Sequence, residues 1–266
     1  MLSILAALGL CLATWKILQG GWRGQSGLQV TGLEASSGVV AVLAVAAAVY
    51  FWGFLYGIAL IVAVVVHEFG HVAAYRVCGH ADARFRLIPL MGGVAISDST
   101  PAQADREFFI TLMGPAINLA PMALCLAAAE VIFTARFTTE LPYQLGSYLF
   151  VQGMVLAALN FFNLLPLWPL DGGKMTQRLV YTFAPSLTRQ VSIAMMLLAV
   201  GLCLLTQSLF LLFFVLMSWP GLMQAESRLG ALRPLPPKRA LLALAAYLAT
   251  AAAFFMGGHP LLLGFI

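Results

Sequence analysis

The chain has 266 residues, of which 62% are hydrophobic and 9% are charged. Soluble domains carry roughly 25% charged residues, so this composition excludes an ordinary soluble protein. The net charge of +4 is modest, and in a membrane protein such a surplus first indicates topology, so we expect no nucleic acid partner.

Apolar runs of about 17 to 25 residues recur along the chain, and each is long enough to cross a hydrocarbon core of about 30 Å. We therefore expect an all-α polytopic membrane protein with about seven transmembrane helices, within a range of about six to eight. The predicted spans are residues 2–18, 39–78 as one or two spans, 107–133, 147–165, 190–206, 207–224 and 240–257. The predicted domains are an N-terminal span with a polar loop (1–38), a core (39–228), and a basic segment with a C-terminal span (229–266).

Residues 39–78 are too long for a single straight span. As one helix they would reach about 60 Å, which is twice the hydrocarbon thickness, so we expect a break. Gly53 and Gly57 favour a tight hairpin near residues 50–57, which would give two spans. One tilted helix with a start that lies on the membrane surface is the alternative.

A basic loop follows Gly79 and is predicted to lie in the cytosol, as is the basic stretch 228–239. Within this loop, residues near 85–97 are typical of a short β-hairpin, with Gly92 and Gly93 at the turn or at a close approach to another backbone. Further along, Pro166 and Pro169 predict that residues 163–173 are not regular helix.

The sequence HEFGH, residues 67–71, lies in one of the most apolar stretches of the chain. His67 and His71 are four residues apart, so on a helix their imidazoles share one face. This spacing suits two ligands of one tetrahedral zinc ion, and Glu68 between them is typical of the general base in HExxH metalloproteases. The alternative is a helix end whose polar side chains are solvated at the membrane surface. Ionisable groups inside a span are costly and usually functional, which favours the metal site.

Two histidines leave a catalytic zinc ion one protein ligand short. Asp171 is the best remaining carboxylate, because the proline-broken segment before it and Gly172 and Gly173 after it indicate irregular backbone that lines protein or a wet cavity. An Asp-Gly turn at the membrane interface is the alternative. His80 lies three residues beyond the position that an extended HExxHxxGxxH motif requires, so we expect a polar loop residue there.

Four segments of the chain, HEFGH, LIPLMGGVAI, GPAIN and NLLPLWPLDGG, occur in the order and approximate spacing of one known family. The chain resembles the site-2 protease family of intramembrane zinc metalloproteases over residues 51–228. The resemblance implies that His67, His71 and Asp171 bind zinc, that Glu68 is the general base, and that the active site faces the cytosol. Asn163 matches the family's asparagine at the head of the Asp-Gly motif, a candidate for holding the substrate or stabilising the oxyanion.

Departures from the family pattern predict a compact, membrane-only member. Trp168 stands where the family often has proline, which alters the wall of the site but spares the ligand. The loop at 134–146 is too short for a PDZ domain, and no pair of CBS domains follows residue 239.

The predicted function is hydrolysis of peptide bonds within or near transmembrane segments of membrane proteins, as a zinc metalloendopeptidase of regulated intramembrane proteolysis with one zinc ion per chain. Gly92, Gly93 and Val94 are predicted to hold the unwound substrate by adding a strand to a sheet edge, with an ordinary glycine turn as the alternative. The expected location is the plasma membrane of a prokaryote, in the lipid bilayer. The sequence leaves open whether a regulatory membrane protein is a partner.

Two other functions stay open from the sequence. A membrane metal-binding or transport protein is one, because intramembrane His, Glu and Asp also mark ion pathways. Transport predicts polar side chains along several spans, whereas the ionisable groups here converge on two motifs. A catalytically silent homologue that serves as a binding scaffold is the other, although a scaffold has no chemical need for Glu68.

Overall fold

The computed structural model describes residues 2–22, 35–88, 92–135, 139–207 and 225–263, together with residues 212, 215, 216, 219 and 222. These residues fall into two compact units. The first unit contains Met1–Ser99, Met113–Phe161 and Thr250–Ile266, and the second contains Thr100–Leu112 and Phe162–Ala249. The domain division expected from the sequence stays a prediction.

Long apolar helices dominate the part of the chain that the structure describes. Five of them are long and apolar enough to cross a membrane, and Ser3–Ile17 is a shorter apolar helix. One two-stranded sheet accompanies them. This confirms the predicted all-α polytopic class with a short β-hairpin, whereas the span expected at 207–224 falls mostly outside the described residues.

Helix α2 (Ala35–Val77) is sharply bent. Its backbone leaves the helical region at Gly53, where φ is 78° and ψ is 168°, a conformation that favours glycine. A Cβ atom on Gly57 would lie only 2.7 Å from the backbone carbonyl carbon of Ala48, although these residues would be about 13 Å apart along a straight helix. The expected break is therefore confirmed, and it lies at Gly53.

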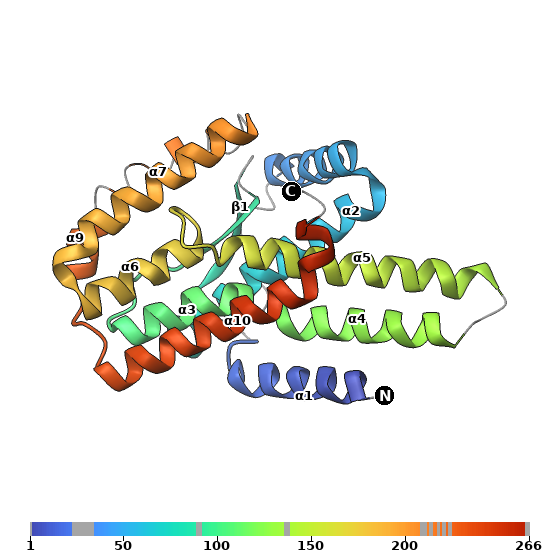
Figure 1. Ribbon diagram of the computed structural model, residues 1–266, viewed down its shortest axis with the longest axis horizontal. Coiled ribbons are helices and arrows are strands. Elements are labelled where there is room, and N and C mark those ends of the chain that lie inside the picture. Colours follow the sequence, from blue (N-terminus) through green and yellow to red (C-terminus); the bar gives the residue numbers. More distant parts are fainter. Residues whose placement is uncertain are drawn as a thin grey trace. The chain divides into compact units, whose positions relative to one another are not determined.

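Helix α4 (Leu119–Thr134) packs beside α1 (Leu2–Ile17) and α5 (Glu140–Asn163) in the first unit (Figure 1). Gly153 lets α5 approach α4, because a Cβ there would lie 2.7 Å from the Leu126 side chain. The span expected at 107–133 is confirmed as a candidate membrane span, Ala104–Thr134, but it is divided into two helices, α3 (Ala104–Ala116) and α4. Residues 117 and 118 separate them, and the GPAIN segment therefore ends at this junction.

Buried amides tie the second half of α2 to the neighbouring helices. The Gln152 side chain on α5 donates to the carbonyl of Ala59 at 3.1 Å, and Asn118 donates to the carbonyl of Ala63 at 3.2 Å. Both amides are at most 4% exposed. Hydrogen bonds between helices hold apolar segments together where the hydrophobic effect between helices is weak.

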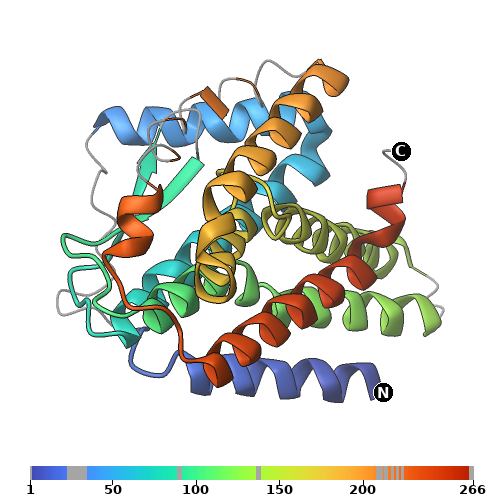
Figure 2. The same ribbon diagram turned by 60° about the vertical axis from the view of Figure 1, so that its left-hand side comes forward.

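Strands β1 (Arg84–Ile88) and β2 (Gly92–Ile96) form the predicted antiparallel hairpin, seen side by side in Figure 2. The register pairs Phe85 with Ala95. Gly92 and Gly93 open strand β2, opposite Ile88 and Leu87. The turn that joins the strands, residues 89–91, lies outside the described residues.

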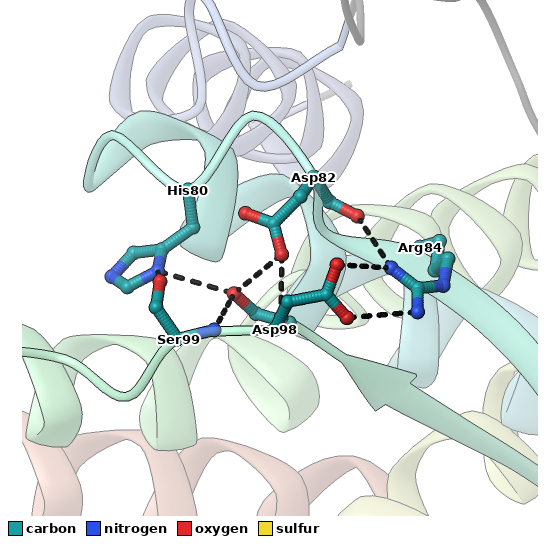
Figure 3. Close-up of polar contacts among 6 residues, drawn as sticks. His80, Asp82, Arg84, Asp98 and Ser99 are labelled. Atoms are coloured by element: carbon teal, nitrogen blue, oxygen red, sulfur yellow. Dashed lines mark hydrogen bonds and ion pairs between the residues drawn. The ribbon is translucent and has the colours of Figure 1, made fainter.

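A polar cluster closes the open end of this hairpin. Its members are His80, Asp82, Arg84, Ser97, Asp98 and Ser99 (Figure 3). Arg84 binds both carboxylate oxygens of Asp98, at 3.1 and 2.9 Å, and His80 Nδ1 lies 2.9 Å from Ser99 Oγ. The backbone N–H of Asp98 donates to Asp82, and this bond holds the pKa of the Asp82 carboxyl below its ordinary value.

The second unit contains α6 (Asp171–Phe183), the short 3₁₀ helix η1 (Pro185–Leu187), α7 (Thr188–Thr206), α9 (Ala225–Gly230) and most of α10 (Pro237–Leu263). Helix α6 is amphipathic, and its polar residues Gln177 and Arg178 are buried. Gln177 donates to Ser192 Oγ of α7 at 3.0 Å, and Arg178 donates to the carbonyl of Leu229 in α9 at 3.0 Å. The irregular backbone predicted for residues 163–173 is confirmed for residues 164–170, whereas regular helix already resumes at Asp171.

Replacing Asp82 by Asn should loosen the hairpin. The amide accepts the Asp98 N–H less strongly, so we expect hydrogen exchange across residues 84–98 to be roughly threefold faster at pH 7. Because folding depresses the pKa of Asp82, the carboxylate stabilises the hairpin above its ordinary pKa of about 3.9, and this contribution is lost as the pH falls through the lower folded value. The ratio of the hydrogen-exchange rate in Asp82→Asn to the rate in the wild type should therefore approach one in acid. Asp105→Asn, outside the hairpin, is the control, and equal rates at pH 7 would contradict the role of Asp82.

Candidate metal centre

His67 and His71 present two nitrogen ligands from one face of α2. Their Nε2 atoms are 3.2 Å apart, and the rings meet nearly edge to face at 78°. Two nitrogens on a tetrahedral zinc ion with bonds of about 2.0–2.1 Å would be about 3.3 Å apart. The spacing of the imidazoles therefore fits two adjacent corners of one coordination tetrahedron.

Asn160 of α5 fixes the orientation of His67. Its Oδ1 lies 2.8 Å from His67 Nδ1, and its Nδ2 donates to the carbonyl of Leu156 at 2.6 Å. Because Oδ1 can only accept, Nδ1 of His67 carries the hydrogen and Nε2 carries the lone pair. A buried acceptor behind a metal-binding histidine is the arrangement that fixes ring tautomer and direction.

Asn160 was not found from the sequence. The signal that could have found it is an amide inside a long apolar run, three residues before the Asn163 that the motif singled out. Asn160 is fully buried, with 0% exposure.

Two glycines, Gly70 and Gly114, allow close packing beside the histidines. A Cβ atom on Gly114, in the GPAIN segment, would lie 2.2 Å from Nε2 of His71. Within HEFGH itself, a Cβ on Gly70 would lie 2.2 Å from the carbonyl oxygen of Met113. Both distances are far below van der Waals contact, so only glycine lets the backbone of residues 113 and 114 approach this face of α2.

Glu68 points to the β-hairpin. Its Oε2 accepts a hydrogen bond of 3.2 Å from the backbone N–H of Ala95 in strand β2. The carboxylate is half-buried. The glutamate predicted as general base is thus held between the histidine helix and the strand predicted to bind substrate.

Asp171 begins α6 in the second unit and is 5% exposed. An acidic residue in the first turn is stabilised by the helix dipole, and Lys174 Nζ lies 3.0 Å from Asp171 Oδ1. Cβ atoms on Gly172 and Gly173 would lie 2.2 and 2.3 Å from the carbonyl oxygens of Leu164 and Leu167. The alternative of an Asp-Gly turn is therefore wrong, because both glycines are inside a helix that the preceding loop covers closely.

The remaining predicted residues also have defined places. Asn163 is the last residue of α5 and is half-buried, and it belongs to the second unit. His80 lies in the polar cluster of the hairpin, as expected for a loop residue. The first unit thus brings together His67, His71 and Glu68, and the participation of Asp171 and Asn163 stays a prediction.

Comparison with models of protein families identifies the family of this chain. The model of peptidase family M50 matches residues 55–148 and 141–207, which cover both the HEFGH and the Asp-Gly motifs. The chain belongs to peptidase family M50. The predicted resemblance to site-2 proteases, the intramembrane zinc metalloproteases of this family, is confirmed.

Two curated relatives are similar to part of the chain. It is 31% identical over 116 residues to Stage IV sporulation protein FB of Bacillus subtilis, and 30% identical over 130 residues to a zinc metalloprotease of Methanocaldococcus jannaschii. These matches cover 44% and 49% of this chain, but only 37% and 35% of the relatives' own lengths. A solved site-2 protease from Methanocaldococcus jannaschii aligns with a TM-score of 0.43 and 22% identity, over 72% of this chain and 88% of that one.

Asn160→Leu should weaken zinc binding by about 10- to 100-fold, because His67 loses the acceptor that orients it. Zinc affinity can be measured by competition with a chromogenic chelator. The matched control is Gln152→Leu, which removes another buried amide of α5 that bonds to α2 without touching a histidine. Equal zinc affinities in the two variants would contradict the orienting role of Asn160.

Gly114→Ala should also lower zinc affinity, because the added methyl group would displace the His71 imidazole. We expect a loss of at least about tenfold, of the size seen when a supporting contact of a metal ligand is removed. Gly153→Ala introduces the same methyl group between α5 and α4 and should leave zinc binding unchanged. Wild-type affinity in Gly114→Ala would show that His71 does not need this space.

Proposed function

We propose that this chain is a zinc metalloendopeptidase that hydrolyses peptide bonds within or near transmembrane segments of membrane proteins. One observation carries the proposal: His67 and His71 hold their Nε2 atoms 3.2 Å apart on an apolar helix, with Glu68 beside them. Membership of peptidase family M50 supports it.

The donor set fits zinc. Two imidazole nitrogens and one buried carboxylate, from His67, His71 and Asp171, would hold one zinc ion per chain and leave one position open, as in catalytic zinc sites. When bound, zinc acidifies water and polarises the scissile carbonyl. Asn160 supports this assignment, because it leaves the lone pair of His67 on Nε2.

Glu68 is the proposed general base. Its carboxylate takes a proton from the attacking water and delivers it to the leaving amine. The N–H of Ala95 holds one carboxylate oxygen and fixes the side-chain direction, while the other oxygen can receive the proton. Asn163 is the proposed donor to the oxyanion or to the substrate backbone.

Strand β2 is the proposed substrate platform. The N–H of Ala95 donates to Glu68, so this edge of β2 faces away from β1 and toward the general base. A transmembrane helix hides its carbonyls in internal hydrogen bonds, so a substrate must unwind before it can add a strand here. Gly92, Gly93 and Val94 precede Ala95 on the same strand and would extend the pairing.

The proposed setting is a prokaryotic plasma membrane, with the active site near the cytosolic side. The basic residues of 76–106 and 228–239 support this orientation, and both curated relatives belong to prokaryotes. Cleavage of this kind would serve regulated intramembrane proteolysis, in which a second membrane protein controls access to the substrate.

Glu68→Gln should retain one zinc ion per chain and lose at least about 100-fold of peptide-bond cleavage, because the amide cannot take the proton. Asp171→Asn should lose zinc affinity as well as cleavage. The measurement pairs metal analysis of purified protein with cleavage of a panel of single-span substrates in detergent.

His80→Gln is the control, because His80 is a histidine of the same unit that lies in the polar cluster, and it should retain both zinc and cleavage. Cleavage by Glu68→Gln at the wild-type rate would show that Glu68 is not the general base. Absence of zinc from folded wild type would overturn the metal centre and favour a scaffold. Zinc movement across vesicles without cleavage would favour transport.

A further inference from the structure

A cavity of about 70 Å³ lies within the second unit, between α3, α6 and α9. This volume corresponds to about two water molecules, or to one small oxyanion group. Among the described residues that line it, Lys174, Arg178 and Arg228 are cationic and Glu107 is acidic. Lys174 is also paired with Asp171, and Arg178 with Glu107. A hollow whose lining side chains carry more positive than negative charge favours an anion.

Arg178 supplies an unsatisfied donor at this cavity. The residue is 2% exposed, and two of its guanidinium nitrogens have partners, the carbonyl of Leu229 and the carboxylate of Glu107. Its Nε is buried and has no hydrogen-bond partner among the described residues. Because a buried N–H without an acceptor is costly, this atom indicates a ligand that brings an acceptor oxygen.

The other residues that line the cavity suit the polar headgroup of an amphiphilic lipid. Arg228 lies 5.7 Å above the ring of Trp168, and Phe108 and Met175 add apolar surface beside the charges. Arg228 also opens the basic stretch, with Arg233, Lys238 and Arg239, that leads into the apolar helix α10. Basic pockets at such a junction are where proteins bind anionic lipid headgroups.

We infer that this cavity binds the phosphate group of an anionic phospholipid. The phosphate oxygens accept from Nε of Arg178 and from the guanidinium of Arg228, and Trp168 with its apolar neighbours contacts the glycerol backbone. Free inorganic phosphate shares this chemistry. Neither source depends on the proposed proteolysis, so binding can be tested without a cleavage assay.

The experiment uses the full chain in detergent and measures its thermal stability against increasing dioctanoyl phosphatidic acid, dioctanoyl phosphatidylcholine or inorganic phosphate at matched ionic strength. We expect saturable stabilisation by phosphatidic acid, little by phosphatidylcholine, and little by phosphate. Arg228→Gln should weaken the apparent affinity for phosphatidic acid about tenfold, because one charge-assisted hydrogen bond is lost.

Arg233→Gln is the matched control, because Arg233 is an exposed arginine of the same basic stretch that does not line the cavity. Wild-type affinity in this control, with the loss in Arg228→Gln, would support the lipid site. Equal losses in both variants, or none in Arg228→Gln, would overturn it in favour of general surface charge. Phosphate binding as tight as that of phosphatidic acid, and equally sensitive to Arg228→Gln, would overturn the lipid as the source.

Discussion

The hydrogen bond between His67 and Asn160 joins α2 to α5 inside an apolar layer, where a polar group left without a partner costs several kcal/mol, about 4 or more in hydrocarbon. Among the described residues, this hydrogen bond is one of three that buried amides make to α2. The carbonyls of Ala59 and Ala63, each one turn further from the site, accept from Gln152 and from another buried amide. Residues four apart lie on one face of a helix, so these contacts fix the rotation of α2 about its axis. The direction of the histidines follows from that rotation.

The packing around the candidate centre also depends on the close approach of neighbouring backbones. Apolar helices in lipid gain little from the hydrophobic effect between them, so they rely on van der Waals packing between small residues. Gly70 and Gly114 meet this requirement beside the histidines, and Gly172 and Gly173 meet it beside Asp171. Each motif therefore combines a predicted site residue with a glycine that lets the neighbouring chain come near. The two kinds of residue recur together because the chemistry has to be covered by protein.

Much of the candidate centre could be predicted from the sequence, because HExxH spacing is a local property of one helix. The hairpin and the break in α2 were also predictable, since Gly53 stands in a run too long to span. Asn160 could not be assigned, because its role depends on a contact with a residue 93 positions away. Helix α6 was missed for a different reason. Its polar face is buried by hydrogen bonds to α7 and α9, so its pattern does not resemble that of a span.

The contact between Glu68 and strand β2 has a consequence for how this protein tolerates sequence change. The donor is the main-chain N–H of Ala95, which every residue except proline possesses. Replacement scans that truncate or recharge the side chain at position 95 would therefore leave this bond in place. In the proposed function, the side chains of the strand can therefore differ for different substrates while the hydrogen bond to Glu68 stays in place. The proposed recognition of substrate and the positioning of Glu68 would thus use different atoms of strand β2.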